Sequence, residues 1–537
     1  MTRVERYARY RAPEGNGQRL VVPPWSEMGD VLAESAAWRA RADVGVLDEP
    51  LAEFSAAARR ELIAESAKYV ASFGAPLPLA ADVHERPLIL TGHQPELVHP
   101  GVWLKNIAAA ALAEQHGGAA VQLVIDADAC RSTAIRVPTG SVHVPRLDLV
   151  EFDRPAAAMP WEERRILDND CWRSFPDRVA KATSSLLADR MINQWWPMVV
   201  ERSAATGLIG ASLAQARYLS ERAWGCRNLE LPQSQMCQTV AFRRFALHIL
   251  RELPRFVDAY NSALADYRRL HHLRNHAQPV PDLDADGVWL EAPFWLWTAA
   301  DPQRRAVFIR SMAGSIIVSD RAGFERTLPT GAGETEQTLA EMREWETAGV
   351  KLRSRALITT MFARLALADL FIHGIGGARY DEATDAICER FFSTAPPAYA
   401  TLSGTLRLPI AHPPGGAGDA SKLRRQLREL EFHPERHLPF DRMATSERSS
   451  VEELVKIKER AVQSPSTPAG AAARHQAIVS ANQGLHALLN GRRATVEQEL
   501  AASIDRARHN RILDSREYAF CLYPSSLLEE FLLDFST

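Results

Sequence analysis

The sequence lacks the features that mark several common protein classes. Its six cysteines include no C-x-x-C pair and no zinc-like spacing, so we expect reduced thiols that are mostly buried. No run of about 18 apolar residues occurs, which argues against a transmembrane helix. The first residues carry charges of both signs without an apolar segment, which argues against a secretory signal. We therefore expect a cytoplasmic protein.

Neither sign of charge dominates. The chain has 63 Lys and Arg against 66 Asp and Glu, for a formal net charge of −3. Such a chain has no global field to attract nucleic acid or an anionic membrane. Hydrophobic residues make up 46% of the 537 residues, which is ordinary for a folded protein, and the length suggests about three domains. The expected partners are small-molecule substrates, not nucleic acid and not a membrane.

One stretch, residues 88–106, combines a strand, a polar turn and the start of a helix. Its apolar beginning does not alternate, which is typical of a buried strand in a parallel sheet. The helix is predicted from about 102 to 116, and a second buried strand, 119–125, follows a Gly-Gly stop. Strand, helix and strand at this spacing indicate a βαβ unit, and hence an α/β fold with a doubly wound parallel sheet.

The turn of this stretch lies at the carboxyl end of its strand, where open α/β sheets bind ligands. The following helix offers unpaired N–H groups and the positive end of its dipole, which suit a phosphate. His93 and His99 are the candidate catalytic residues. The candidate cofactor-binding residues are Thr91, Gly92, Gln94, Gly101, Lys105 and Asn106. For this turn considered alone, an ordinary strand-to-helix connection is the commoner explanation.

Two carboxylates follow the second strand. Asp126 and Asp128 would face the same side if the chain stays extended, and they are further candidate catalytic residues. They could hold Mg²⁺ or orient an attacking amine. An equally good explanation is a turn in which aspartate bonds the local backbone. We assign no residue as a protein ligand of a resident metal.

A second strand, Gly-rich turn and helix occurs late in the chain. The strand spans 369–373, and a helix is predicted from Asp381 to Phe392. The turn between them can expose backbone N–H groups to an anion, although it lacks the full G-x-G-x-x-G fingerprint. The candidate binding residues here are Gly376, Gly377, Tyr380 and Asp381. Two such turns on one sheet are a stronger indication of a nucleotide site than either alone.

Four segments are predicted along the chain. They are an N-terminal helical extension (1–80), an α/β core with a β-meander insertion at 282–320 (81–410), a helical arm (411–515) and a C-terminal segment that returns to the core (516–537). Within them we expect helices at 25–42, 51–73 and 237–272 and a strand at 518–523. The narrow apolar seam of the arm suits a coiled coil that forms a homodimer, or a helical subdomain with its own core.

These motifs resemble those of the cysteine-adding ligases of bacillithiol synthesis. Thr91-Gly-His-Gln-Pro-Glu-Leu97 is similar to the family's T-G-Q-Q-x-x-L. Arg355-Ala-Leu357, followed by Ile375-Gly-Gly377 and Tyr380, is similar to its R-P-L and G-G-P-G-E-x-x-Y, and the order of parts agrees as far as Leu522-Tyr-Pro524. The resemblance implies a Rossmann-like nucleotidylyltransferase core with a C-terminal coiled coil, and it adds Arg355 to the candidate cofactor-binding residues.

The chain departs from the family's pattern at several positions. His93 replaces the first Gln of the family's pair, and the acidic E-D-H-D stretch is reduced to Asp126-Ala-Asp128. The later glycine and the acid of G-G-P-G-E are absent after Gly377. His99-Pro-Gly-Val102 looks like the superfamily's H-x-G-H without its second histidine. We expect these differences to affect the binding of the family's cysteine and glucosaminyl-malate substrates more than they affect the fold.

The resemblance implies an ATP-dependent, ligase-like enzyme that joins a carboxylate, such as that of an amino acid like cysteine, to an amine. ATP or another nucleotide is the expected cofactor, with Mg²⁺ possible. One alternative is a catalytically degenerate protein of the same fold that acts as a nucleotide sensor or scaffold. Another is a transferase that uses a nucleotide sugar in the same cleft.

Overall fold

The centre of the molecule is a six-stranded sheet. The computed structural model describes residues 10–412, 417–465 and 470–535. The strands, in spatial order, are β1 (Arg19–Val22), β18 (Tyr399–Gly404), β17 (Leu370–His373), β4 (Leu88–His93), β5 (Ala119–Val124) and β10 (Leu229–Pro232). All neighbours pair in parallel except β1, which is antiparallel to β18. The prediction of an α/β protein with a largely parallel sheet is confirmed.

Both faces of the sheet are covered, which explains why its strands are continuous apolar runs. On one face Ile89 and Leu370 pack with residues of α1 (Met28–Arg41) and α3 (Pro100–Gln115). On the other face Leu90 and Leu123 join a larger core that includes α2 (Leu51–Ser72). A strand buried on both sides has no solvent-facing positions, so its sequence does not alternate.

The order of the strands reverses at β4. After β4 the chain adds β5 and then β10 on one side, and it later adds β17 and β18 on the other side. Thr91 of β4 lies opposite Ile372 of β17 in the register. Because the connections leave β4 and β17 in opposite directions, a crevice opens between their carboxyl ends, which is where doubly wound sheets bind ligands.

The first 80 residues hold the two predicted helices, α1 and α2, but they also contribute to the central sheet. The strand β1 pairs with β18, from Arg19 opposite Gly404 to Val22 opposite Thr401. Two further short strands, β2 (Gly45–Val46) and β3 (Glu49–Pro50), form a small hairpin before α2. No strong local pattern marks β1, because this edge strand has only four residues and all of them are partly exposed.

A second, antiparallel sheet confirms the predicted β meander and extends it. Its strands are β11 (Ala285–Asp286), β12 (Trp289–Thr298), β13 (Arg305–Met312), β14 (Ser315–Ser319), β15 (Glu325–Pro329) and β16 (Val350–Ser354). The first five follow one another in space, and β16 pairs with Phe294–Thr298 of β12, past the residues that pair with β11. A separate two-stranded sheet after β5 pairs β7 (Ala134–Gly140) with β8 (Pro145–Glu151).

The long helix predicted at 237–272 is two helices. They are α9 (Val240–Arg251) and α10 (Leu253–Leu270), separated at Glu252. Pro254 lies at the second position of α10, where its missing N–H group needs no intrahelical acceptor. Five further helices lie next to the sheets, namely α7 (Ile209–Ala223), α8 (Gln233–Met236), α12 (Ala356–Phe362), α13 (Ile375–Phe391) and α18 (Ser525–Leu533).

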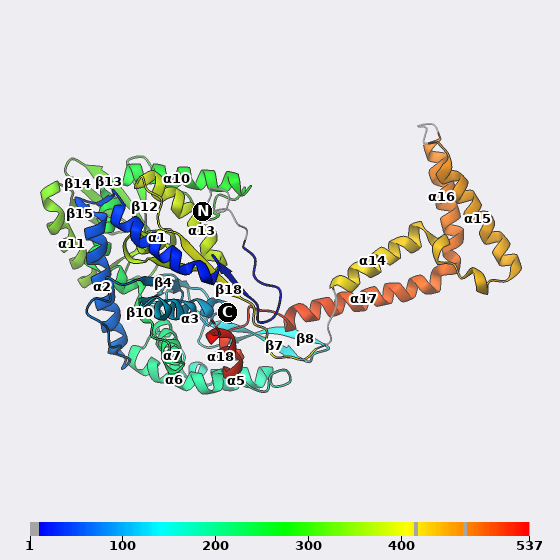
Figure 1. Cartoon of the computed structure of the whole chain (residues 1–537), viewed down its shortest axis with the longest axis horizontal. Helices are drawn as coiled ribbons and strands as arrows, with labels where there is room; N and C mark the ends of the chain where they lie inside the picture. Colours follow the sequence, from blue (N-terminus) through cyan, green and yellow to red (C-terminus); the bar gives the residue numbers. More distant parts are fainter. Residues whose placement is uncertain (1–9, 413–416, 466–469, 536–537) are drawn as a thin grey trace. The chain divides into compact units, whose positions relative to one another are not determined.

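The strand predicted at 518–523 is wrong. Residues Phe520–Leu522 form a single 3-10 turn instead. The backbone N–H of Phe520 donates to the carbonyl of Val98, and the carbonyl of Tyr523 accepts from the N–H of Met191. The backbone of this segment therefore bonds to residues that belong to no strand. Residues 516–535 belong to the same compact unit as the sheet, and α18 packs against α3 (Figure 1).

Of the described residues, 138–147, 409–412, 417–465 and 470–515 form a second compact unit. Its helices are α14 (Ala417–Phe432), α15 (Thr445–Gln463), α16 (Ala471–His486) and α17 (Asn490–Leu513). Helix α14 packs on α17, and α15 packs on α16 (Figure 1). Leu430, Val451 and Leu485 belong to a separate small core, so these helices bury apolar side chains among themselves.

Two expectations drawn from the sequence concern the state of the cysteines and the presence of a membrane-spanning helix. All six cysteines are free thiols, and only Cys171 is not fully buried. Over the described ranges, no helix combines the length and the apolar character needed to cross a bilayer. The expectation of reduced, mostly buried thiols is confirmed.

Asp369 anchors the start of β17 to two helices and to β4. Its buried carboxylate accepts from Arg39 of α1, from Arg59 of α2 and from the backbone N–H of Leu88. We expect Asp369→Asn to lower the free energy of unfolding by about 3–5 kcal/mol, because two buried guanidinium groups lose their counter-charge. Urea unfolding followed by circular dichroism measures this.

The matched control for this change is Asp301→Asn. Asp301 forms an exposed ion pair with Arg305, and such pairs contribute little to stability. Its urea midpoint should equal that of the unchanged protein. An Asp369→Asn midpoint as high as that of the control would show that this carboxylate does not hold the helices to the sheet.

Candidate functional site

A pocket of about 420 Å³ opens at the carboxyl ends of β4 and β17. Of the predicted site residues, those that line it are Gly92, His93, Gln94, His99, Gly101, Lys105, Gly376, Gly377, Tyr380 and Asp381. The predicted turns after β4 and β17 therefore form two sides of one cavity. The start of α12, Ser403 of β18 and Arg516 complete the wall.

Two helices begin at this pocket. His99 caps α3, and its Nδ1 accepts from the backbone N–H of Gly101 at 3.1 Å. Gly374 caps α13, whose first intrahelical hydrogen bond runs from Ala378 to the carbonyl of Gly374. The N–H groups that precede Ala378 have no acceptor within the helix, so the positive ends of both helix dipoles face the pocket.

The helix predicted to start at Asp381 is thus wrong at its N-terminus, because α13 begins at Ile375, inside the predicted turn. Gly376 and Gly377 occupy its first turn. Glycine lowers helix propensity, which made this segment look like a loop, but packing of the helix against the core outweighs that cost. The N–H groups of the two glycines that face the pocket therefore belong to the first turn of a helix and not to a loop, as the sequence had suggested.

Lys105 supplies a buried positive charge. Its side chain is 4% exposed, and its Nζ donates to the carbonyl of Gly92 at 2.9 Å. The aliphatic part passes next to Gly374, so the ammonium group lies between the two turns. Burial lowers the pKa of Lys105 to about 8, and the group is still mainly charged at pH 7.

Arg516 supplies a second positive charge that the sequence did not predict. Its Nη2 donates to Ser403 Oγ at 3.0 Å and its Nη1 to Thr405 Oγ1 at 3.3 Å. Glu517, which is 60% exposed, lies 3.2 Å from its Nε. No local pattern marks Arg516 as a site residue, because the segment that carries it reaches the pocket only after the chain has returned to the sheet.

The two candidate catalytic histidines are uncharged at neutral pH. Burial, with Arg217 and Lys105 near by, lowers the pKa of His93 well below its usual value. His93 Nδ1 donates to the carbonyl of Gln94 at 2.8 Å, which leaves Nε2 with its lone pair. Burial lowers the pKa of His99 to about 4. Charge stabilisation in this pocket therefore falls to Lys105 and Arg516 rather than to the histidines.

Asp126 and Asp128 do not form a joint site. The carboxylate of Asp126 accepts from the N–H of Ser234 at 2.8 Å and from its hydroxyl at 2.5 Å. Burial and the charge of Glu162 raise the pKa of Asp126 to about 7. Asp128 instead accepts from Gln94 at 2.9 Å and from Arg304 at 2.9 Å. The chain turns after β5, so the condition that it stays extended is not met.

The position of Asp128 matches the turn explanation. Its Oδ1 also accepts from the backbone N–H of Ala129 at 2.8 Å, which is a local bond typical of aspartate in turns. Neither aspartate lines the pocket. Among the residues that the structure describes, no group of three or more His, Cys, Asp or Glu side chains is arranged to hold a metal ion.

Three other predicted residues are engaged elsewhere in the core. Thr91 Oγ1 donates to the carbonyl of Ile372 at 2.9 Å and ties β4 to β17. Asn106 donates to Glu221 of α7 at 2.8 Å. Arg355 pairs with Glu291 at 2.6 Å and lies over the ring of Trp295. These contacts give the three side chains structural roles, and none belongs to the described lining of the pocket.

Asp381 lies at the bottom of the pocket in an ion cluster. It is 1% exposed, and its Oδ2 lies 2.6 Å from His373 Nε2 and 2.9 Å from Arg364 Nη1. Burial acts to raise the pKa of Asp381, but His373 and Arg364 together hold it well below its usual range. The cluster fixes α13 on β17. Tyr380, by contrast, is 41% exposed at the mouth of the pocket.

Gly377 and Gly376 differ sharply in the space around them. A Cβ atom at position 377 would lie 2.6 Å from His373 Nδ1, whereas a Cβ at position 376 meets nothing within 4 Å. We expect Gly377→Ala to lower the free energy of unfolding by about 1–3 kcal/mol, because the imidazole must move from Asp381. Gly376→Ala should leave it unchanged or raise it, since alanine favours helix. Urea unfolding of both variants gives the comparison, and equal effects would contradict it.

Comparison with models of known protein families gives no match, and comparison with curated protein sequences gives none either. The resemblance to the cysteine-adding ligases therefore consists of the short motifs around Thr91, Arg355 and Gly376. The geometry of the pocket is an independent indication of its chemistry.

Proposed function

We propose that the pocket between β4 and β17 binds the phosphate groups of a nucleotide, with ATP as the first candidate. One observation carries the proposal, which is that two helix N-termini and two cations meet in one cavity. Helices α3 and α13 contribute the N-termini, and Lys105 and Arg516 contribute the cations. Backbone N–H groups at a helix start, joined by Lys and Arg, form the usual protein site for phosphate.

The rest of the cavity suits a nucleoside. A volume of about 420 Å³ lies within the range of small-molecule pockets. Val102, Ile125 and Phe371 give it apolar walls, and the half-exposed Tyr380 lies at its mouth. The strand order and the place of the pocket at its reversal support a Rossmann-like core in our proposal.

We propose further that the bound nucleotide activates a carboxylate for attack by an amine, as in the ligases that the motifs resemble. Lys105 and Arg516 would offset the negative charge that develops on the departing phosphate. Gln94 lines the pocket and donates a hydrogen bond to Asp128, so it would be the side chain that contacts the amine, with Asp128 holding it in place. Mg²⁺ would arrive with the nucleotide phosphates, and we assign it no protein ligand.

A second candidate function is nucleotide sensing without catalysis. It is favoured by the low pKa values of His93 and His99, which leave the pocket without a strong base. Incubation of the protein with ATP, Mg²⁺ and a mixture of amino acids and amines separates the two. Release of phosphate or pyrophosphate that depends on both substrates would establish the ligase, and binding without release would favour the sensor.

The helical arm is proposed to form a homodimer. Ile457, Leu488 and Ile504 are each at least 40% exposed on its helices. Apolar side chains in excess of those needed for the arm's own core suit a contact between two copies. Sedimentation of the full chain measures this, and a monomer at micromolar concentration would count against it.

We expect the protein to bind ATP in titration calorimetry and the Lys105→Met variant to bind it about ten- to a hundredfold more weakly, because a charged donor to the phosphates is lost. Lys181→Met is the matched control, since Lys181 is an exposed lysine outside the pocket. It should bind as the unchanged protein does. Absence of ATP binding to the unchanged protein, or equal affinity of the two variants, would overturn the proposed site.

The affinity for ATP should also depend on pH through Lys105. The pKa of Lys105 is lowered to about 8, so the ammonium group is charged at pH 7 and mostly neutral at pH 9. If only the charged form binds, the affinity falls by about tenfold between these values. Calorimetry at pH 7, 8 and 9 tests this, and the Lys105→Met variant should show no such fall. A fall of the same size in that variant would assign it to another group.

A further inference from the structure

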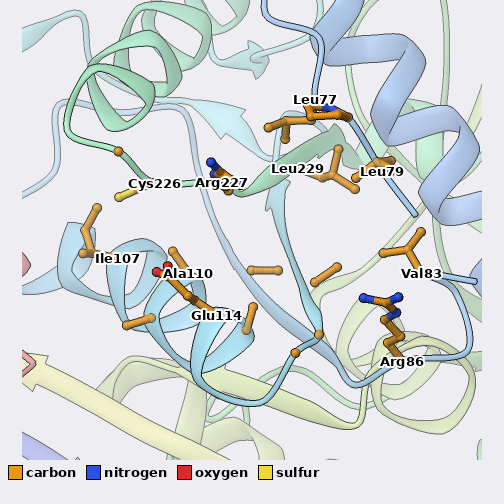
Figure 2. Close-up of a pocket in the computed structure, with 18 of the residues that line it drawn as sticks. Leu77, Leu79, Val83, Arg86, Ile107, Ala110, Glu114, Cys226, Arg227 and Leu229 are labelled. Carbon is orange, nitrogen blue, oxygen red and sulfur yellow. The ribbon is translucent and has the colours of Figure 1, made fainter. Parts of the chain in front are cut away.

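A second cavity, of about 600 Å³, lies at the opposite ends of the strands (Figure 2). Ala119, at the start of β5, and Leu229, at the start of β10, form its floor. Its walls come from the segment before β4, from α3, from the turn after α7 and from the end of α18. It shares no lining residue with the nucleotide pocket, so a ligand of this cavity is independent of the proposed function.

Small side chains on α3 leave the space for this cavity. On the side that faces the cavity this helix carries Ala110, Ala111 and Ala113, where larger side chains would fill the space. The helix ends at a tight turn, in which a Cβ atom at Gly118 would lie 2.1 Å from the carbonyl oxygen of Pro87. The backbone around the cavity is therefore closely packed, and the space results from small side chains rather than from loose packing.

Apolar side chains form most of the wall. Leu77, Leu79 and Val83 lie on one side in Figure 2, and Ile107 of α3 lies on the other. Cys226 is 7% exposed at the edge of the cavity, and burial raises the pKa of its thiol to about 12, so it is uncharged. Such a wall binds a hydrocarbon chain, and each methylene group that it removes from water adds to the affinity.

The charged groups of the lining favour an anion. The lining contains two guanidinium groups, those of Arg86 and Arg227, and one carboxylate, that of Glu114. Arg86 forms an exposed pair with Asp82, 2.9 Å apart, and pairs of this kind are weak enough to yield to a ligand. Arg227 has no ion pair or side-chain hydrogen bond with any part of the chain that the structure describes. Figure 2 shows Arg86 near Val83, and Arg227 between Cys226 and Leu229.

We propose that this cavity binds a monocarboxylate with a straight apolar chain. The chain lies between α3 and the leucines, and the carboxylate accepts hydrogen bonds from Arg227, with Arg86 as the second cation. A planar carboxylate matches the fork of a guanidinium group in two parallel bonds, which a neutral head group cannot do.

The test is calorimetric titration with hexanoate, octanoate and decanoate, each below its micelle concentration. The affinity should rise with chain length, by up to about fourfold per methylene group until the cavity is filled. Decanol, which has the same chain without the charge, should bind about tenfold more weakly than decanoate. Affinity that does not change with chain length, or that is equal for decanoate and decanol, would overturn the proposal.

Two variants locate the site. Arg227→Gln should weaken decanoate by about tenfold and leave decanol unchanged, because only the charged contact is lost. Ala111→Leu should weaken both, because its side chain occupies the space of the ligand. Arg136→Gln removes an exposed arginine outside the cavity and should change neither affinity.

Thermal unfolding of each variant shows that it is folded, and Arg86→Gln replaces Arg227→Gln if that variant melts early. Decanoate binding that Ala111→Leu leaves intact would place the ligand elsewhere and overturn the assignment. Because the nucleotide pocket is not involved, loss of decanoate binding with ATP binding retained is the expected behaviour of Ala111→Leu.

Discussion

The placement of β4 between β5 and β17 organises the central sheet and the pocket at its edge. A buried strand must bond its backbone groups on both edges, and β4 finds one neighbour near in sequence and one almost three hundred residues away. Because those neighbours are reached by connections that leave in opposite directions, two turns separate at the carboxyl ends. The pocket, the two helix N-termini and the contact of Asp369 with both helices all follow from this pairing.

Burial then decides which groups in the pocket carry charge. Removal from water lowers the pKa of every cationic group, but the groups start from different values. His99 falls to about 4 and is neutral, whereas Lys105 falls only to about 8 and stays mainly charged at pH 7. His93 and His99, which first drew attention to the turn after β4, are thus uncharged hydrogen-bonding groups. The positive charge of the pocket comes from Lys105 of α3 and from Arg516, which is distant in sequence.

Local patterns predicted the elements well where burial and periodicity agreed. The strands β4 and β5, the helix between them, the β meander and the helices of the second unit are of this kind. The predictions failed where tertiary contacts outweighed local preference. Two glycines suggested a turn but lie in the first turn of α13, and the apolar stretch at 518–523 looked like a strand but bonds to loops. Propensities of single residues are small against packing, so boundaries move by several residues.

Local sequence patterns are enough to show that strand, turn and helix occur twice and that glycine, lysine and histidine lie at those turns. Which turns meet depends on tertiary contacts. In the folded chain the glycines of α13 and Lys105 line one pocket. Asp126 accepts a hydrogen bond from Ser234, and Asp128 accepts one from Gln94. Arg355 lies over the ring of Trp295, outside the pocket. The physical reason is that side-chain partners depend on the order of strands in the sheet, and that order is set by long-range burial and pairing, which no local window of sequence contains.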